Sequence, residues 1–95
     1  MKRILVPLLL ALCLPVAAQA DCYVEYKAKQ DGPLRLHYGI ARLPGGDCPP
    51  GAEAADLLRP RLAGGGWTLL NVVGLSTETP GDKKKANAGD FFLRY

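Results

Sequence analysis

Histidine, tryptophan and methionine each occur only once in this sequence of 95 residues. A single histidine argues against most metal sites and against histidine-based catalytic machinery. Strong charge of one sign is also missing, because a net charge of +3 is too small to mark a dedicated nucleic-acid binder. Wholesale disorder is excluded, because 48% of the residues are hydrophobic and 22% are charged. The length suits one small domain.

The first twenty residues have the pattern of a signal peptide. Lys2 and Arg3 precede an uncharged stretch at residues 4–18 that is rich in Leu, Val and Ala, and an A-x-A sequence follows at 18–20. This order of charged, apolar and small residues is typical of a secreted precursor. A retained membrane anchor is the alternative, but the stretch is shorter than the roughly 20 residues that span a bilayer. We therefore expect a signal peptide at 1–20, a secreted, periplasmic protein, and no stable membrane span after cleavage.

Cleavage would leave two cysteines, Cys22 and Cys48, in an oxidising compartment. A structural disulfide between them is the expected outcome. A metal site would need more ligands than two thiols and one histidine, and a redox pair would favour C-x-x-C spacing. In the chain-entropy model, a loop of this size contributes roughly 3.5 kcal/mol to stability.

Two alternating stretches predict a β-hairpin. Apolar and polar residues alternate over 22–29 and again over 34–41, and the turn sequence Gln30-Asp31-Gly32-Pro33 lies between them. Pairing around Asp31 and Gly32 would place Cys22 opposite Arg42. Cys48 could then return to the start of the first strand.

A helix is predicted over residues 52–62, which are rich in Ala and Leu and follow two prolines. Pro60 should end this helix near Arg59 or kink it, and the glycines at 64–66 should terminate it. Its apolar face would consist of Ala55, Leu58 and Leu62.

The last third of the chain predicts two further strands. Residues 67–75 are nearly all apolar, as in a strand that is covered on both faces or lies centrally in a sheet. Residues 76–89 read as a long polar loop, and residues 91–95 as a short final strand. The expected fold is therefore α+β, in the order β-β-α-β-β, with a four-stranded, mainly antiparallel sheet and one helix packed on one face. A single domain with one disulfide would occupy residues 21–95.

No catalytic grouping is apparent in the sequence. His37 lies on the polar side of the second predicted strand, where we expect a solvated surface histidine, and no serine or threonine has a histidine near it. The carboxylates are scattered, and the glycines at 64–66 precede a strand rather than a phosphate-binding helix. We expect no enzyme activity, no cofactor and no metal.

A surface is the remaining candidate for function. The expected register places Lys27 near His37 and Lys29 near Arg35 on the sheet face that the helix leaves uncovered. A plain solvated face is the alternative, and the lysine run at 83–85 could serve solubility or capture an acidic surface. The candidate binding residues are Lys27, Lys29, Arg35, His37, Phe92 and Arg94, with Lys83, Lys84 and Lys85 in the loop.

Residues 62–72 read LAGGGWTLLNV, and the chain closes with FLRY at 92–95. A helix, a Gly-Trp-x-Leu strand and a short aromatic-basic strand in this order resemble small uncharacterised bacterial domains of the β-α-β-β kind. The resemblance implies the fold of this part of the chain. It brings no activity and no catalytic residues.

These observations favour a non-catalytic binding or interaction module. Secretion and a net charge of +1 for residues 21–95 argue against nucleic acid. An envelope protein or an anionic envelope component is the expected partner, and a homodimer through the open sheet face or an edge strand is a further expectation. The alternative function is a small inhibitor of a secreted or envelope hydrolase, which would present the loop at Ser76–Gly89.

Overall fold

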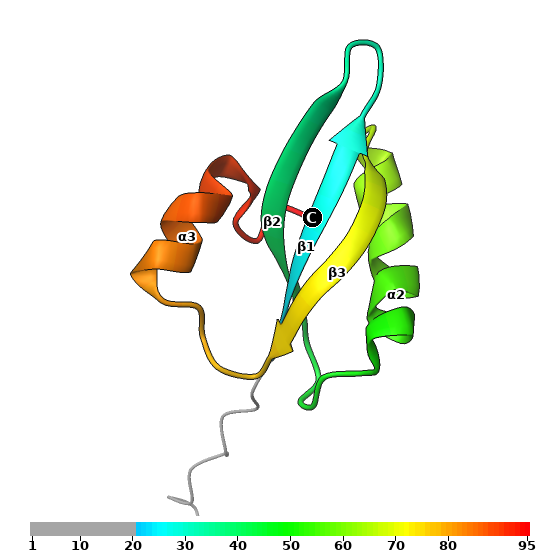
Figure 1. Cartoon of the computed structure of the whole chain (residues 1–95). Helices are drawn as coiled ribbons and strands as arrows, with labels where there is room; N and C mark the ends of the chain where they lie inside the picture. Colours follow the sequence, from blue (N-terminus) through cyan, green and yellow to red (C-terminus); the bar gives the residue numbers. More distant parts are fainter. Residues whose placement is uncertain (1–20) are drawn as a thin grey trace, which may run out of the picture.

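The computed structural model describes residues 21–95, so the expected signal peptide lies outside the described residues. Three strands form one antiparallel sheet in the order β2-β1-β3. Helix α2 packs against one face of this sheet, and α3 lies beside β2 on the opposite side (Figure 1). The fold is α+β, with three strands and two helices instead of the expected four and one. The elements are β1 (Cys22–Gln30), β2 (Arg35–Leu43), α2 (Gly51–Gly64), β3 (Thr68–Ser76), α3 (Asp82–Ala88) and the 3-10 turn η1 (Gly89–Phe91).

The predicted hairpin is present, but its register differs by one residue from the expected one. Cys22 pairs with Leu43 instead of Arg42, because the turn between the strands has four residues, whereas the expected pairing leaves three. A shift of one residue moves every side chain of β2 to the other face of the sheet. His37 consequently pairs with Ala28 and not with Lys27.

The small residues of β2 explain why this register packs well. Gly39 lies opposite Tyr26, and a Cβ atom at this position would collide with the Tyr26 ring. Ala41 lies opposite Val24, so β2 leaves room on this face for the large side chains of β1. Leu36, which the expected register would bury, is 66% exposed.

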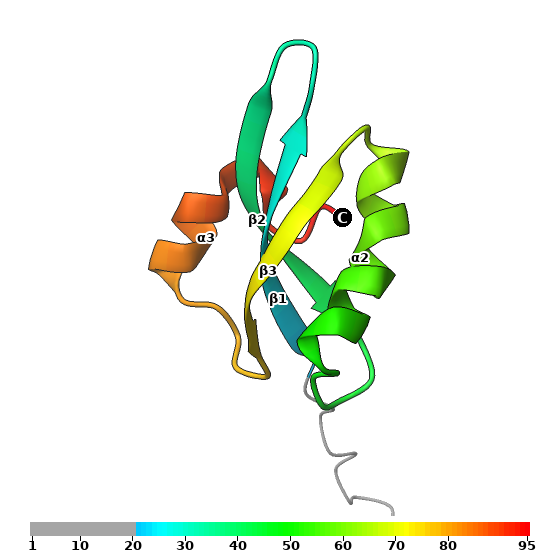
Figure 2. The ribbon, with the colours of Figure 1, turned by 45° about the vertical axis from the view of Figure 1, so that its right-hand side comes forward.

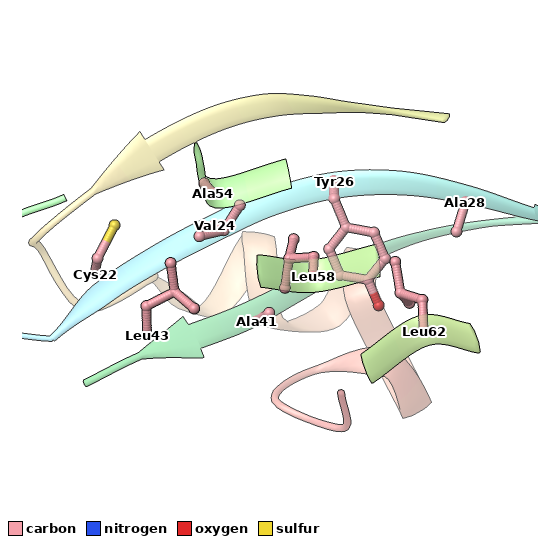
Figure 3. Close-up of a cluster of buried hydrophobic side chains, with 9 residues drawn as sticks. All are labelled: Cys22, Val24, Tyr26, Ala28, Ala41, Leu43, Ala54, Leu58 and Leu62. Carbon is pink, nitrogen blue, oxygen red and sulfur yellow. The ribbon is translucent and has the colours of Figure 1, made fainter. Parts of the chain in front are cut away.

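The core lies between the sheet and α2 (Figure 3). A disulfide joins Cys22 to Cys48 and thereby ties the start of β1 to the segment that leads into α2. This bridge confirms the predicted pairing. The buried cluster consists of Cys22, Val24, Tyr26, Ala28, Ala41, Leu43, Ala54, Leu58 and Leu62.

Helix α2 continues past Pro60, which neither ends it near Arg59 nor shortens it. Proline removes the hydrogen bond to the carbonyl of Asp56, but both residues are exposed, so water can solvate that carbonyl. Leu58 and Leu62 are fully buried on either side of the proline and hold the helix on the sheet. Ala54, rather than Ala55, is the fully buried alanine of this face.

Strand β3 is an edge strand, whereas the sequence suggested a central or doubly covered one. The central strand is β1, which pairs with β2 on one side and with β3 on the other. Two irregularities interrupt the β1–β3 register, and the extra residues are Leu70 and Val73. Their side chains are 50% and 45% exposed, respectively.

The segment expected to be a loop at 76–89 contains α3. Asp82 begins this helix just after Gly81, and lysines and alanines, which are good helix formers, continue it. Gly89 follows with a φ of 54°, which favours glycine. The polar composition of this segment led us to expect a loop instead of this helix.

Residues 91–95 do not form the expected fourth strand. Phe92 makes a single parallel bridge to Ile40, where the amide of Leu93 donates to the Ile40 carbonyl at 2.7 Å. The chain then passes the edge of β2, and its end lies between the sheet and α2 (Figure 2). Tyr95 accordingly packs against the core cluster.

Candidate functional site

The structure does not gather the six predicted binding residues on one face. Lys27 and Lys29 point away from α2, whereas Arg35 and His37 belong to the opposite face of the sheet. Phe92 lies at the edge of β2, and Arg94 lies further along in the C-terminal tail. The one-residue register difference is the physical reason, because it separates the pairs that the sequence placed across from each other.

His37 is a buried residue, contrary to the expected surface histidine, with only 9% of its area exposed. Its ring stacks on Phe91 with 3.7 Å between centroids and meets the Trp67 ring edge-on at 4.2 Å. A hydrogen bond of 2.9 Å joins its Nε2 atom to the Tyr26 hydroxyl. The aromatic residues at 67 and 91 lie in other parts of the sequence, so local alternation could not reveal this environment.

Burial governs the electrostatics of this pair. It lowers the pKa of His37 below its ordinary value. Burial raises the pKa of Tyr26 to about 12, and electrostatic repulsion between its ionised form and Tyr95 contributes. Both groups are therefore neutral at pH 7, and their hydrogen bond is part of the packing of the domain.

We expect the free energy of unfolding to fall when the pH is lowered below 6.5, the ordinary pKa of His37. The folded pKa is lower than the unfolded one, so this stabilisation is complete above pH 6.5 and is lost as the pH falls through the folded pKa. Denaturant unfolding at a series of pH values measures the effect. His37→Gln should flatten the profile between pH 7 and 5, and an equally steep profile in this variant would contradict the assignment.

On the outer sheet face, which is turned away from α2, helix α3 packs against the half that holds Glu25 and Ile40. Lys84 donates to Glu25 at 2.9 Å, and Tyr38 donates to the same carboxylate at 2.8 Å. Burial raises the pKa of Glu25, but these two hydrogen bonds and the Lys84 charge outweigh it, so the net pKa is lowered. Ile40 is fully buried beneath the C-terminal segments.

The lysine run is thus part of a packed helix rather than a free loop. Lys84 forms a salt bridge with Glu25, and the Lys85 ammonium lies 5.6 Å from the centre of the Phe92 ring. Lys83 is exposed and lines a depression with the segment before α3. Contacts within the domain therefore explain the positions of two of the three lysines, Lys84 and Lys85.

The other half of the outer face is uncovered and has a depression of about 220 Å³. Its lining includes Ala28 and His37, which are buried, and four further residues. We call the side chains of these four, Lys27, Leu36, Tyr38 and Leu70, the open face. Leu36 and Leu70 are 66% and 50% exposed, and within residues 21–95 the Lys27 ammonium has no acidic partner within 4.0 Å. Lys29, by contrast, pairs with Asp31 at 3.2 Å. Of the residues that line the depression, Lys27 and His37 were predicted. Leu70 was not, because its position depends on an irregularity in β3.

The described residues contain no cluster of three or more His, Cys, Asp or Glu side chains that could hold a metal ion. None of the helices formed by residues 21–95 has the length and apolar character needed to cross a bilayer. The disulfide fits a location outside the cytoplasm, because bridges in small domains persist in oxidising compartments.

Comparison of the chain with protein-family models, curated proteins and solved structures found no match. The geometry of the described residues is therefore the basis for assigning a function.

Proposed function

We propose that residues 21–95 form a non-catalytic interaction module that is secreted to the periplasm and binds an envelope protein through the open face. The observation that carries this proposal is the apolar depression beside Lys27, which has no acidic partner among these residues. Exposed apolar patches with a charged neighbour are typical of protein-binding surfaces.

The chemistry of the open face favours a particular partner. The side chains of Leu36, Leu70 and Tyr38 form the walls of the depression. Its volume of about 220 Å³ suits one apolar side chain. The Lys27 ammonium would attract a carboxylate next to that side chain. We therefore expect the partner to present an acidic segment with an exposed apolar residue.

The shape of the molecule supports access to this surface. The turn between β1 and β2 projects past the end of α2 in both views (Figures 1 and 2). Leu34, in this turn, is 64% exposed. A partner can approach the hairpin without meeting either helix.

A pull-down from envelope extract tests the proposal. Lys27→Glu should lose the proteins that the wild type captures, because it reverses the charge that would attract the partner. Lys83→Glu is the matched control, since it makes the same change at an exposed lysine away from the open face. Mass spectrometry identifies the captured proteins.

Equal capture by Lys27→Glu and Lys83→Glu would exclude the open face as the binding surface. Binding to anionic vesicles without any captured protein would point to an anionic envelope component instead. Concentration-dependent dimers in sedimentation, abolished by the same charge reversal, would mean that a second copy occupies this face.

The alternative, a hydrolase inhibitor, depended on a free loop at Ser76–Gly89. Seven of these residues form α3, and Lys84 holds this helix to Glu25. The segment available for presentation to an active site is therefore much shorter than expected. The geometry consequently supports the interaction module better.

A further inference from the structure

Three arginines from separate elements line one depression on a different part of the molecule. Its volume is about 360 Å³, and it shares no lining residue with the open face. Arg42 comes from β2, Arg61 from α2 and Arg94 from the C-terminal tail. We call this depression the arginine pocket; Pro44, Leu93 and Tyr95 complete its lining.

Contacts with the backbone and with an aromatic ring position two of these arginines, Arg61 and Arg94. The Arg61 guanidinium donates to the carbonyl of Arg42 at 3.0 Å, which links the end of α2 to the end of β2. The Arg94 guanidinium lies 5.8 Å from the centre of the Tyr95 ring. The amide of Leu93 donates to Ile40 at 2.7 Å and fixes the tail next to β2. The side chains are thus partly ordered before any ligand arrives, which reduces the entropy lost on binding.

The side chains that line the pocket carry an excess of positive charge. No aspartate or glutamate lines it. Arg42 has one long contact, with 3.7 Å between its Nε atom and the Asp21 carboxylate. Among residues 21–95, Arg61 and Arg94 have no carboxylate within 4.0 Å. Three like charges around one depression repel one another, and an anion at their centre would relieve this repulsion.

We infer that the arginine pocket binds a phosphate group. A guanidinium offers several N–H donors in a planar fork that matches the oxygens of phosphate, and it stays charged at all ordinary pH values. Three such groups can satisfy the several oxygens of one phosphate. Arg61 keeps further N–H donors besides the Nη1 group that binds Arg42. This site is independent of the open face and of its protein partner.

Titration of the purified protein with inorganic phosphate tests the inference. NMR signals of the arginine side chains should shift and saturate in the wild type. Arg61→Gln and Arg94→Gln should each weaken binding at least tenfold. Arg59→Gln is the matched control, because Arg59 lies on the same helix, pairs with Asp56 and does not line the pocket. Unchanged thermal unfolding confirms that the variants remain folded.

The absence of saturable shifts in the wild type, or equal binding by Arg61→Gln and Arg59→Gln, would overturn the inference. Vesicles of phosphatidylglycerol and of phosphatidylcholine then distinguish the sources of the phosphate. Binding to phosphatidylglycerol that Arg61→Gln abolishes assigns the pocket to a lipid headgroup. Binding of free phosphate without vesicle binding assigns it to a soluble phosphate compound. Lys27→Glu should leave all these results unchanged, which separates this test from that of the open face.

Discussion

Replacing both Cys22 and Cys48 by alanine should lower the free energy of unfolding by about 3.5 kcal/mol in the chain-entropy model. The bridge closes a loop with a sequence separation of 26 residues and thereby restricts the unfolded chain. A domain of this size has little core with which to offset such a loss, since small domains have only a few kcal/mol of net stability. Denaturant unfolding of the oxidised wild type and of the double variant measures the difference.

Reduction of the wild-type protein provides the matched control. Cys22 is fully buried, so the double variant also loses apolar packing, whereas reduction leaves both sulfur atoms in place. We expect reduction to account for most of the destabilisation. A midpoint that does not change after reduction would show that the bridge does not constrain the unfolded chain.

Leu58→Ala should destabilise the domain by about 2–5 kcal/mol, the range for a leucine deleted from a core. Leu58 is fully buried between α2 and the sheet (Figure 3). Its neighbour Leu57 is 45% exposed and supplies the control, since Leu57→Ala should change stability by less than about 1 kcal/mol. Thermal and denaturant unfolding of both variants give the comparison. Equal losses in the two variants would contradict the orientation of the helix.

Local patterns in the sequence predicted the elements that depend on local physics. The alternation over 22–29 and 34–41 predicted the hairpin. The disulfide was predicted because Cys22 and Cys48 are the two cysteines outside the expected signal peptide, and the structure contains it. The register was wrong by one residue, because the turn is longer than the Asp-Gly sequence suggests. That single difference placed His37 on the wrong face of the sheet.

The errors in the last third of the chain have a common physical cause. Polar composition made 76–89 look like a loop, although α3 is stabilised by Lys84 contacting Glu25, which lies 59 residues away in sequence. The apolar run before Ser76 suggested a central strand, although β1 takes that place. Such tertiary contacts override local composition, and local patterns cannot reveal them.

Both candidate surfaces depend on the same kind of long-range placement. The open face brings Lys27 and Leu36 of the hairpin next to Leu70 of β3. The arginine pocket joins the ends of β2 and α2 to the tail. The sequence showed that Lys27 and Arg94 were candidates, but the residues that surround them come from elements whose positions depend on the register and on the path of the tail.

The affinity of the captured partner for Leu36→Ala tests the proposed function most directly. Leu36 contributes to the wall of the depression and is largely exposed, so its truncation should leave the fold intact. Leu93→Ala is the control, because Leu93 is also exposed, at 39%, but lies away from the open face. Isothermal titration calorimetry should show at least a tenfold weaker Kd for Leu36→Ala, a loss of about 1.4 kcal/mol, and little change for Leu93→Ala. Unchanged affinity in Leu36→Ala would show that the open face is not where this protein meets its partner.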